Sequence, residues 1–574
     1  MKKYGIYLLF PPEVNLKSEG LGRYLAALLK ASLANPNVKF VIACPSWMHP
    51  TLQSLLKDFG LELSQFELIS PAKSPFLIRY YFALKNFYTK LPNIQRQIFR
   101  VKNRIRRERI NKPFPFINVA KNILASRNTL IGLVSLPFIL IYFVLSLIVS
   151  VTTHTVATFL SIRNFYVEKK SLIYRVLSKF KLHKYKSLKT IYNKIPRAVK
   201  SRKKKSPHPL GNISCILKLF KIIQVKEALY LNKLINNRSD IDAWYCPTIF
   251  WPEVTLLNAP TLICVPDVVV DFCPVGFAMS YGSDLHSKVN NLRSTISQGE
   301  YFITYSEDVK INTLMKNYNI NSDKIFVIRH GNNDLSQLII NDLIPSSQTD
   351  VIKHCQSLVT DAINKTGHIY SGNIKFIFYA SQNRPNKNIL SLLKAYNILL
   401  KQHYINLKLV LTADRHVSSE ILQFIGENNL HHEILFLSGL SSEQLAACYK
   451  LAELTVNPSL SEGGFPFTFN ESLSVNTPTV MANINVTTEI IKNPELQKMM
   501  LFDPYNVNDI VNKIAWGLQN KQTLLEQQTK IYEELSKRTW EDVIDEHIQA
   551  LDQISNSNKF KSAEHRIKEV CLEY

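Results

Sequence analysis

The residues best suited to chemistry are two glutamates on either side of two adjacent glycines, in the stretch NPSLSEGGFPFTFNESLSV. Gly463 and Gly464 follow a strand-like apolar run and precede a predicted helix, and glycine lets backbone N–H groups approach an anion at a helix start. An ionised carboxylate has two acceptor oxygens, which suit a vicinal diol such as a ribose. We therefore expect a diphosphate at the turn, Glu471 on a ribose and Glu462 nearer the reacting centre. The alternative is that Glu471 only stabilises the helix and Glu462 is solvated.

A second anion-binding pattern is SQNRPNKN, residues 381–388, which follows the apolar run IKFIFYA. Arg384 and Lys387 stand at the start of a predicted helix, where two cations oppose the helix dipole. A bound phosphate removes that conflict, so the pattern predicts a phosphate site. The segment KSEGLGRY follows the first predicted strand, and its Gly20 and Gly22 fit either a further anion-binding loop or an ordinary flexible turn.

The chain that positions these residues alternates short apolar runs with amphipathic stretches. In the C-terminal half the runs are 374–380, 407–413, 434–440, 453–459 and 477–483. In the N-terminal half they are 4–10, 38–44, 242–250, 260–269, 301–306 and 324–331. Strands that alternate with helices predict βαβ units and parallel sheets. The sequence therefore predicts an α/β chain of two Rossmann-like, doubly wound domains that face a crevice, with ligands at the carboxyl ends of the strands.

The expected domain boundaries follow from these runs. Residues 1–72 and 240–340 form the first domain, and residues 341–535 form the second. Residues 73–239 interrupt the first domain as a basic, partly apolar helical insert, and residues 536–574 form C-terminal helices and a tail.

The insert carries the positive charge of the chain, whose formal net charge is +24. Residues 73–205 hold 30 Lys and Arg against two acids, so the rest of the chain is slightly acidic. The run 128–162 within it contains no Asp, Glu, Lys or Arg and is long enough for a transmembrane helix. Both flanks are basic, and both must return to the same sheet. We therefore expect a hairpin or interfacial helix at the cytoplasmic face, with residues 73–205 on an anionic membrane surface.

Other interpretations of the insert are a buried helical hairpin and, less well supported, a nucleic-acid-binding segment. Aromatic residues do alternate with lysines, but no RNA- or DNA-binding motif accompanies them, so nucleic acid is not an expected partner. The overall composition, 46% hydrophobic and 20% charged, excludes a disordered chain. The eight cysteines are scattered, without a C-x-x-C pair, which indicates reduced thiols and a cytoplasmic location. The N-terminal apolar run is cut by Pro11 and Pro12 and predicts a strand, not a secretory signal.

These motifs together resemble those of the retaining family-4 glycosyltransferases of GT-B fold, the glycosyl transferases group 1. The stretch PSLSEGGFPFTFNESLSVNTPTVMANI is similar to the family's two-glutamate signature, and YASQNRPNKNILSLLKAY to its phosphate-binding segment. SEGLGRYLAALL resembles its N-terminal glycine loop, and YFITYSEDVKINTLMKNYNINSDKIFVIRHG the end of its N-terminal domain. The likeness covers nearly all of the chain outside residues 73–240.

The resemblance implies a role for each matching residue. Arg384 and Lys387 would bind the donor diphosphate, assisted by the N–H groups of Gly463 to Phe465, and Gly20 and Gly22 would close over the phosphates. Glu471 would hold the nucleotide ribose, and Glu462 would contact the donor sugar. The reaction would transfer a sugar from a nucleotide sugar with retention at the anomeric carbon. The first domain would bind the acceptor and the second the donor.

Two departures from the family pattern affect individual residues. Eight residues separate Glu462 from Glu471, where the family usually has seven, so the role of Glu462 is open. The family often has a His before the Asp of the loop after the fourth N-terminal strand, whereas here Pro266 precedes Asp267, which remains a catalytic candidate.

The motif SDIDAW contains D-x-D, a metal signature of a different glycosyltransferase fold, but it directly precedes an apolar strand. We therefore expect no metal and no cofactor. The predicted function is a membrane-docked retaining glycosyltransferase with a lipid-linked or surface-polysaccharide acceptor. The alternatives are a glycosyltransferase with a soluble acceptor and a non-catalytic scaffold that binds nucleotide sugars.

Overall fold

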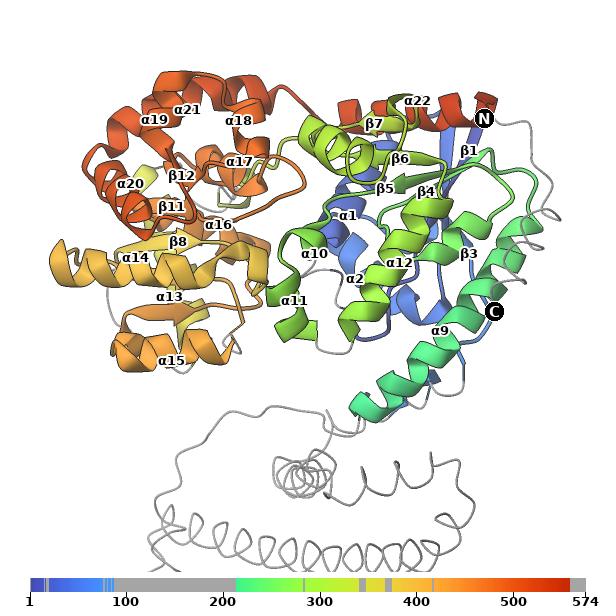
Figure 1. Ribbon diagram of the computed structural model, residues 1–574, viewed down its shortest axis with the longest axis horizontal. Helices are drawn as coiled ribbons and strands as arrows, with labels where there is room; N and C mark the ends of the chain where they lie inside the picture. Colours follow the sequence, from blue (N-terminus) through green and yellow to red (C-terminus); the bar gives the residue numbers. More distant parts are fainter. Residues whose placement is uncertain are drawn as a thin grey trace, which may run out of the picture. The chain divides into compact units, whose positions relative to one another are not determined.

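The computed structural model describes residues 2–14, 16, 20–75, 78–79, 81–83, 85–86, 213–281, 284–339, 347–366, 374–414 and 418–557 (Figure 1). The chain divides into two compact units, Met1–Ala72 with Glu227–Tyr574 and Lys73–Lys226. Most of the expected insert, including the run 128–162, lies outside the described residues. The predictions of a membrane hairpin and of an interfacial helix in that run therefore stay predictions.

The N-terminal domain contains a seven-stranded sheet in the order β3-β2-β1-β4-β5-β6-β7, with every neighbouring pair parallel. The strands are β1 Lys2–Tyr7, β2 Val38–Ala43, β3 Glu67–Ile69, β4 Ala243–Cys246, β5 Thr261–Cys264, β6 Tyr301–Thr304 and β7 Ile325–Val327. The first two strands begin with exposed or half-buried residues and end buried. This pattern is typical of a parallel sheet that is covered on both faces.

Helices cover both faces of this sheet (Figure 1). They are α1 Gly20–Ser32, α2 His49–Asp58, α9 Ile213–Asn236, α10 Val269–Phe272, α11 Pro274–Tyr281 and α12 Asp284–Gln298, with the π-helix Val309–Met315 after β6. One core joins Trp244 and Phe302 of the strands to Leu231 of α9 and Leu292 of α12. The sheet is thus the middle layer of three.

The end of helix α9 belongs to the N-terminal domain and not to the insert. The sequence placed the boundary between residues 239 and 240, but the compact unit begins at Glu227. Ala228, Leu231 and Ile235 of α9 are buried in the core of the sheet. Their spacing places them on one face of the helix, so about the last three turns of α9 fasten the returning chain to the sheet.

The C-terminal domain contains a six-stranded parallel sheet in the order β10-β9-β8-β11-β12-β13. The strands are β8 Phe376–Tyr379, β9 Lys408–Leu411, β10 Ile434–Phe436, β11 Leu454–Asn457, β12 Thr479–Ala482 and β13 Leu501–Phe502. Successive residues of β8 alternate between two cores: Ile377 and Tyr379 pack in one, and Phe376 and Phe378 pack in the other. This alternation follows from the pleat of a strand that is buried on both faces.

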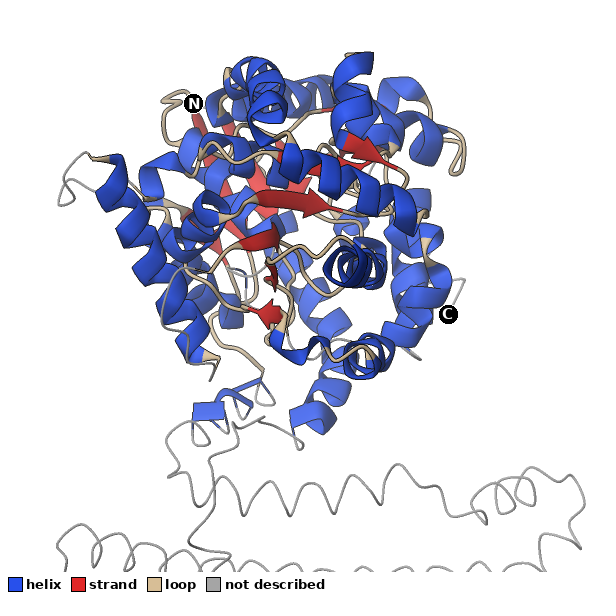
Figure 2. Cartoon of the chain, turned by 90° about the vertical axis from the view of Figure 1, so that its left-hand side faces the viewer, coloured by secondary structure: helices blue, strands red, loops and turns tan. Residues whose placement is uncertain are grey.

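The helices of this domain enclose its sheet (Figure 2). They are α13 Gln348–Lys365, α14 Ile389–Gln402, α15 Ser419–Glu427, α16 Ser442–Leu451, α17 Phe467–Ser474, α18 Asn485–Ile490, α19 Pro494–Met500, α20 Val507–Gln519 and α21 Lys521–Ser536. Helices α14, α17 and α20 contribute to one core, and α13 and α16 contribute to the other.

The last described helix, α22 Trp540–Ser557, returns to the N-terminal domain and packs on α1 and β4. Its buried His547 lies with Nε2 3.3 Å from the Tyr24 hydroxyl and Nδ1 2.7 Å from the Val543 carbonyl oxygen. Burial lowers the pKa of His547 to about 4, so the ring is neutral at physiological pH. The Trp540 ring meets Tyr24 edge-on, with 5.2 Å between the centroids. Helix α22 therefore ties the two ends of the sequence together.

Both sheets have the strand order of a doubly wound fold, and this confirms the predicted α/β class and GT-B architecture. Each order reverses once, between β1 and β4 in the first sheet and between β8 and β11 in the second. In such sheets ligands bind outside the carboxyl ends of the strands at the point of reversal. Within the described residues, no helix has the length and hydropathy required of a membrane span.

Candidate functional site

The two loops at the reversal point of the second sheet carry several of the predicted site residues. The loop after β8 contains Arg384 and Lys387, and the loop after β11 contains Glu462 and the two glycines. Their backbones are fastened to each other by Asn386, whose carbonyl oxygen accepts a bond of 2.8 Å from the Leu460 N–H. The Asn386 side chain in turn donates to the Ser461 carbonyl oxygen over 2.9 Å. The fold therefore brings together two motifs that lie about 75 residues apart in the sequence.

Lys387 and Glu462 form an ion pair between these loops. The distance from Lys387 Nζ to Glu462 Oε1 is 2.5 Å, and the two side chains are only 20% and 14% exposed. Burial disfavours the ammonium charge of Lys387, but attraction to Glu462 outweighs it, so the pKa of Lys387 is raised. The lysine is therefore held as a cation at the carboxyl edge of the sheet.

Arg384 and Asp267 lie close enough to this pair to affect its charges. Arg384 is exposed and directly precedes the 3₁₀ turn Pro385–Lys387. Asp267 follows β5 of the other sheet. Close packing around its carboxyl group raises its pKa, while Arg384 and then Lys387 act in the opposite direction. The fold thus gathers the four residues predicted to be catalytic, and the carboxylate of Asp267 is the one whose charge is disfavoured.

Gly463 and Gly464 lie against the N-terminal domain. A Cβ atom at Gly463 would lie 1.4 Å from the Pro266 carbonyl oxygen, and one at Gly464 would lie 2.7 Å from Cβ of Tyr305. The Gly463 carbonyl oxygen also accepts a hydrogen bond of 2.9 Å from the Ser306 hydroxyl. The sequence predicted close backbone approach at these glycines, toward a diphosphate. The structure shows a close approach to the Pro266 carbonyl group at Gly463 and to the Tyr305 side chain at Gly464, which by itself explains glycine at both positions.

Glu471 is a buried carboxylate with three donors. It lies in the second turn of α17, with 2% of the residue exposed. Its Oε2 accepts a bond of 2.6 Å from the Tyr449 hydroxyl, and its Oε1 accepts one of 2.6 Å from the Asn333 side chain. Arg23 of α1 lies further away, with 3.3 Å between its Nη1 and Oε1. Both oxygens are thus oriented by donors, and Arg23, 44% exposed, is the most distant and most solvated of these partners.

Of the remaining predicted residues, Gly22 and Phe465 have local packing roles in this structure. A Cβ at Gly22 would lie 2.0 Å from the Leu16 carbonyl oxygen, which explains glycine there without a ligand. Gly20 begins α1, and among the described residues no atom lies within 4 Å of a Cβ placed on it. The Phe465 ring packs on Phe469, with 5.2 Å between the centroids.

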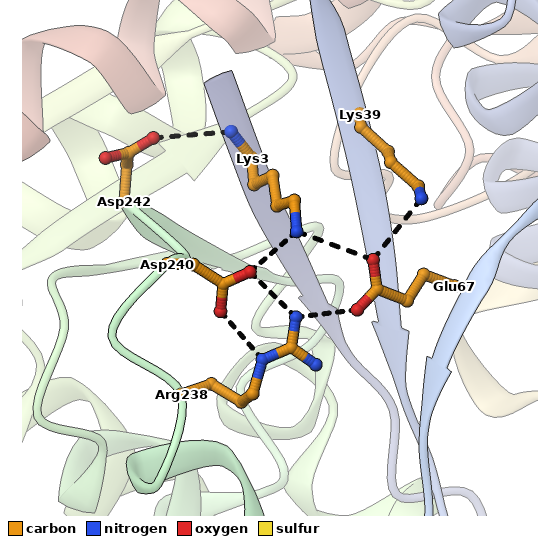
Figure 3. Close-up of polar contacts among 6 residues, drawn as sticks. All are labelled: Lys3, Lys39, Glu67, Arg238, Asp240 and Asp242. Carbon is orange, nitrogen blue, oxygen red and sulfur yellow. Dashed lines mark hydrogen bonds and ion pairs between the residues drawn. The ribbon is translucent and has the colours of Figure 1, made fainter. Parts of the chain in front are cut away.

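The D-x-D motif lies at the opposite, amino edge of the first sheet (Figure 3). Asp240 accepts bonds from Lys3 Nζ at 2.6 Å and from Arg238 Nε at 2.7 Å, and Arg238 also donates to Glu67 at 2.6 Å. Lys39 lies 3.3 Å from Glu67. These contacts satisfy the carboxylates with protein cations. Among the described residues, no group of three or more His, Cys, Asp or Glu has the arrangement of a metal site.

The sequence patterns did not reveal the partners that fix these side chains. Tyr449 and Asn333 orient Glu471, and Ser306 binds the glycine turn. His330 stacks on Phe467 with 4.4 Å between the ring centroids, and its buried Nδ1 has no hydrogen-bond partner. Burial lowers the pKa of His330 to about 3. Only Arg23 had a signal in the sequence, since it stands directly after the glycine loop.

Comparisons with known proteins find similarity to the second domain. Residues 364–538 match the family model described as glycosyl transferases group 1. O-antigen chain mannosyltransferase B of Escherichia coli is 28% identical over 146 residues, 25% of this chain and 37% of the relative. O-antigen chain mannosyltransferase RfbU of Salmonella typhimurium is 24% identical over 206 residues, 36% of this chain and 48% of the relative. The chain thus spans less than half the length of either relative.

Two solved structures are also similar. S. aureus TarM, in complex with Fondaparinux, alpha-GlcNAc-glycerol and UDP, has 17% identity and a TM-score of 0.40 over 56% of this chain and 58% of its own. Anabaena HepE in complex with UDP-glucose has 14% identity and a TM-score of 0.42 over 60% of this chain and 89% of its own. Residues 364–538, in the C-terminal domain, are thus similar to the glycosyl transferases group 1.

Proposed function

We propose that this protein is a retaining glycosyltransferase that moves a sugar from a nucleotide sugar to a lipid-linked or surface-polysaccharide acceptor at the cytoplasmic face of the membrane. The observation that carries the proposal is the partly buried Lys387–Glu462 pair at the reversal point of the second sheet, with Arg384 and Asp267 beside it. Two cations next to two carboxylates suit a reaction in which a diphosphate leaves and an acceptor hydroxyl loses a proton.

In the proposed reaction, electrostatic stabilisation of the departing diphosphate supplies the main catalytic effect. Arg384 and Lys387 hold the phosphate oxygens, together with N–H groups of the Gly463–Phe465 turn. Donors that already stand where negative charge develops need no rearrangement during the reaction. A phosphate oxygen of the leaving group takes the acceptor proton, so no protein nucleophile is required. Glu462 contacts the donor sugar and, through its pair with Lys387, couples sugar position to phosphate position.

Ribose binding by Glu471 requires a change among its present partners. Tyr449 and Asn333 hold the carboxylate at 2.6 Å each, whereas Arg23 is 3.3 Å away and solvated. A ribose diol would replace Arg23 on Oε1 at the lowest cost. The proposal therefore places the ribose on the side of Glu471 that Arg23 covers.

The membrane part of the proposal draws on helix α9 as well as on the basic insert. Val225, Leu229 and Tyr230 are 49%, 47% and 50% exposed, and Lys226 and Lys233 are exposed beside them. These positions form one stripe on the outer face of α9, opposite its buried residues. A mixed apolar and basic stripe suits the interface of an anionic bilayer. The relatives named as O-antigen chain mannosyltransferases support a surface-polysaccharide acceptor.

The first test is ligand-induced thermal stabilisation of the detergent-purified protein. UDP, GDP, ADP and their sugar derivatives, GDP-mannose included, are compared at concentrations up to the millimolar range. A ligand that binds only the folded state raises the unfolding midpoint once it exceeds its dissociation constant. A shift with one nucleotide family supports the donor site, and no shift from well-folded protein contradicts it.

A non-catalytic scaffold that binds nucleotide sugars is the second candidate, and Glu462→Ala separates it from an enzyme. Loss of transfer with the thermal shift preserved supports catalysis. Transfer at the wild-type rate would remove Glu462 from the mechanism. A wild-type protein that binds a nucleotide sugar but transfers to neither water-soluble glycans nor membrane extracts would support the scaffold.

Flotation with vesicles of phosphatidylglycerol and phosphatidylcholine tests membrane attachment. The wild type is expected to float with the anionic vesicles, and much less in high salt. If the protein stays at the bottom of the gradient with every vesicle composition, membrane attachment is contradicted and the soluble-acceptor alternative is favoured.

A further inference from the structure

A second exposed apolar surface lies beside the candidate site. Phe272 of α10 and Val275 and Met279 of α11 are 53%, 73% and 75% exposed. The sequence FCPVGFAMSYGS, which begins at Phe272, contains no charged residue. We call Phe272, Val275 and Met279 the α11 stripe. Large side chains with this exposure on one uncharged segment mark an interaction surface.

Helix α11 is fixed between the core and the phosphate loop. Phe277 is buried against the N-terminal domain, with 2% exposed. Gly276, on another side of the helix, lies against the loop that carries Arg384 and Lys387. A Cβ on Gly276 would be 2.6 Å from Cβ of Pro385. The helix that carries the α11 stripe is therefore in direct contact with the loop proposed to bind the diphosphate.

Tyr505 adds a further apolar side chain near this place, from the second domain. It is 67% exposed and follows Pro504, whose carbonyl oxygen accepts a bond of 2.8 Å from the Asn388 side chain. Asn388 is the residue after Lys387, so the Tyr505 turn is also fastened to the phosphate loop. The Tyr505 hydroxyl also interacts electrostatically with the thiol of Cys273, the residue before α11.

The connection from Asp267 to the stripe is short and ordered. Asp267 precedes α10 by two residues, and the Cys273 N–H donates to the Val269 carbonyl oxygen over 2.8 Å where α10 ends. The Phe277 N–H then donates to the Cys273 carbonyl oxygen over 3.1 Å. Only the short helix α10 separates Asp267 from α11 in the chain. An acceptor whose hydroxyl group approaches Asp267 therefore has an apolar surface nearby.

We propose that the α11 stripe, with Tyr505, binds the hydrocarbon tail of an amphipathic, lipid-linked acceptor. The inference rests on the proposed glycosyltransferase function and names the acceptor class and its subsite. A soluble glycan chain needs hydrogen-bonding partners, and the side chains of the stripe offer it none. An anionic bilayer would find no lysine or arginine within Phe272–Ser280, in contrast to the stripe on α9. A hydrocarbon tail that extends from the reacting centre fits this uncharged surface better than a soluble glycan or an anionic bilayer does.

The test is photolabelling of the full chain with a dodecyl α-mannoside that carries a diazirine in its tail, below its critical micelle concentration. Peptides are then mapped by mass spectrometry. We expect label on the peptide that contains residues 269–281, displaced by excess dodecyl α-mannoside but not by methyl α-mannoside. Label spread over the protein without preference for this peptide, or displaced equally by both competitors, would overturn the inference.

A matched pair of variants tests the side chains. Val275→Ser with Met279→Ser is expected to reduce labelling of the peptide about tenfold or more, because each large apolar side chain contributes strongly to burial of a tail. Leu422→Ser on α15, at a residue 47% exposed in the other domain, is the control and should leave labelling unchanged. Equal labelling of the double variant and the wild type would overturn the inference.

Two further readouts separate the inference from its rivals. The nucleotide-induced thermal shift must persist in the double variant, because α11 is not part of the donor site. A wild type that shows the shift but no label on 269–281 refutes the tail subsite and leaves the glycosyltransferase proposal standing. Loss of vesicle flotation in the double variant would assign the stripe to the bilayer, and a change of oligomeric state would assign it to a second copy. Either result replaces our proposal.

Discussion

The two polar edges of this molecule use the same residue types for opposite purposes. At the amino edge of the first sheet, Asp240 and Glu67 are paired with Lys3, Lys39 and Arg238 in one network. The cations lower the pKa of both carboxyl groups, so their charges are favoured. At the carboxyl edges, in contrast, close packing raises the pKa of Asp267 although Arg384 and Lys387 are near.

A difference of this kind is the one expected between a structural network and a site that binds a ligand. A network that stabilises a fold satisfies each charge with a partner and leaves it near solvent. A site that acts on a ligand keeps a charge in an environment that disfavours it, at a cost to stability. The D-x-D motif at residues 240–242 has the sequence of a metal site but the environment of a structural network (Figure 3). The place of these residues in the fold, and not the D-x-D motif itself, therefore decides between a structural charge network and a metal site.

The largest effect is expected from removing the cation at the carboxyl edge. Lys387→Ala should lower the rate of sugar transfer by about 100-fold or more, the usual cost of losing one electrostatic donor in an active site. Initial rates with the donor identified by thermal stabilisation measure this. Arg238→Ala removes a cation from the other edge and should leave the rate unchanged. A similar loss of rate in both variants would break the distinction between the edges.

Gly463→Ala tests the close approach at the carboxyl edge. The added Cβ would overlap the Pro266 carbonyl oxygen, so the turn or the loop must move. We expect a loss of about 1–3 kcal/mol in unfolding free energy, as for other overpacked sites, together with weaker nucleotide binding. The control is Gly20→Ala, whose Cβ meets no described atom within 4 Å. A Gly463→Ala variant as stable and active as Gly20→Ala would contradict the close contact.

Two isosteric substitutions should shift stability in opposite directions. At neutral pH, Asp267→Asn removes a disfavoured charge and should raise the thermal unfolding midpoint, whereas Asp240→Asn removes a favoured one and should lower it. Both effects are expected to be about 1 kcal/mol or less, and the second is the smaller because Asp240 is 42% exposed. Calorimetry of both variants decides the signs, and equal signs would refute the contrast.

The pH dependence of these two differences follows from the pKa shifts. Asp240 has a lowered pKa, so its contribution is present above its ordinary value of 3.8 and is lost as the pH falls through its folded value. Asp267 has a raised pKa, so its penalty is absent below 3.8 and grows as the pH rises through its folded value. Each variant should therefore approach the wild type in acid. If the stability difference between either variant and the wild type grows as the pH falls, the assigned pKa shift is contradicted.

The smallest effect is expected at Lys39, on the margin of the amino-edge network. Lys39 is 40% exposed and 3.3 Å from Glu67, which also has Arg238 at 2.6 Å. Exposed pairs of this kind contribute about 0.5 kcal/mol or less. Lys39→Ala should therefore leave the unfolding midpoint nearly unchanged, and a loss larger than that of Asp240→Asn would show that the network is centred on Glu67.

Much of the fold could be read from the sequence because strand and helix signals are local. Apolar runs such as 374–380 and 407–413 predicted strands that β8 and β9 confirm, and their alternation with helices predicted parallel sheets. The boundary at residue 239 was wrong because α9 packs on the sheet through Ala228, Leu231 and Ile235, a contact that no local pattern reveals. The return of α22 to α1 was equally invisible, because it joins residues over 500 positions apart.

For the candidate site, sequence supplied the residues and tertiary structure supplied their relations. The types and spacing of Arg384, Lys387, Glu462 and Glu471 were determined by the sequence alone, because helix starts and glycine turns impose local requirements. That Lys387 pairs with Glu462, that Gly463 meets Pro266, and that Arg23 and Asn333 reach Glu471 was decided only when two sheets brought their loops together. The physical reason is range: propensity and patterning act over a few residues, whereas burial, which sets charge and contact, depends on segments that meet only in the folded chain.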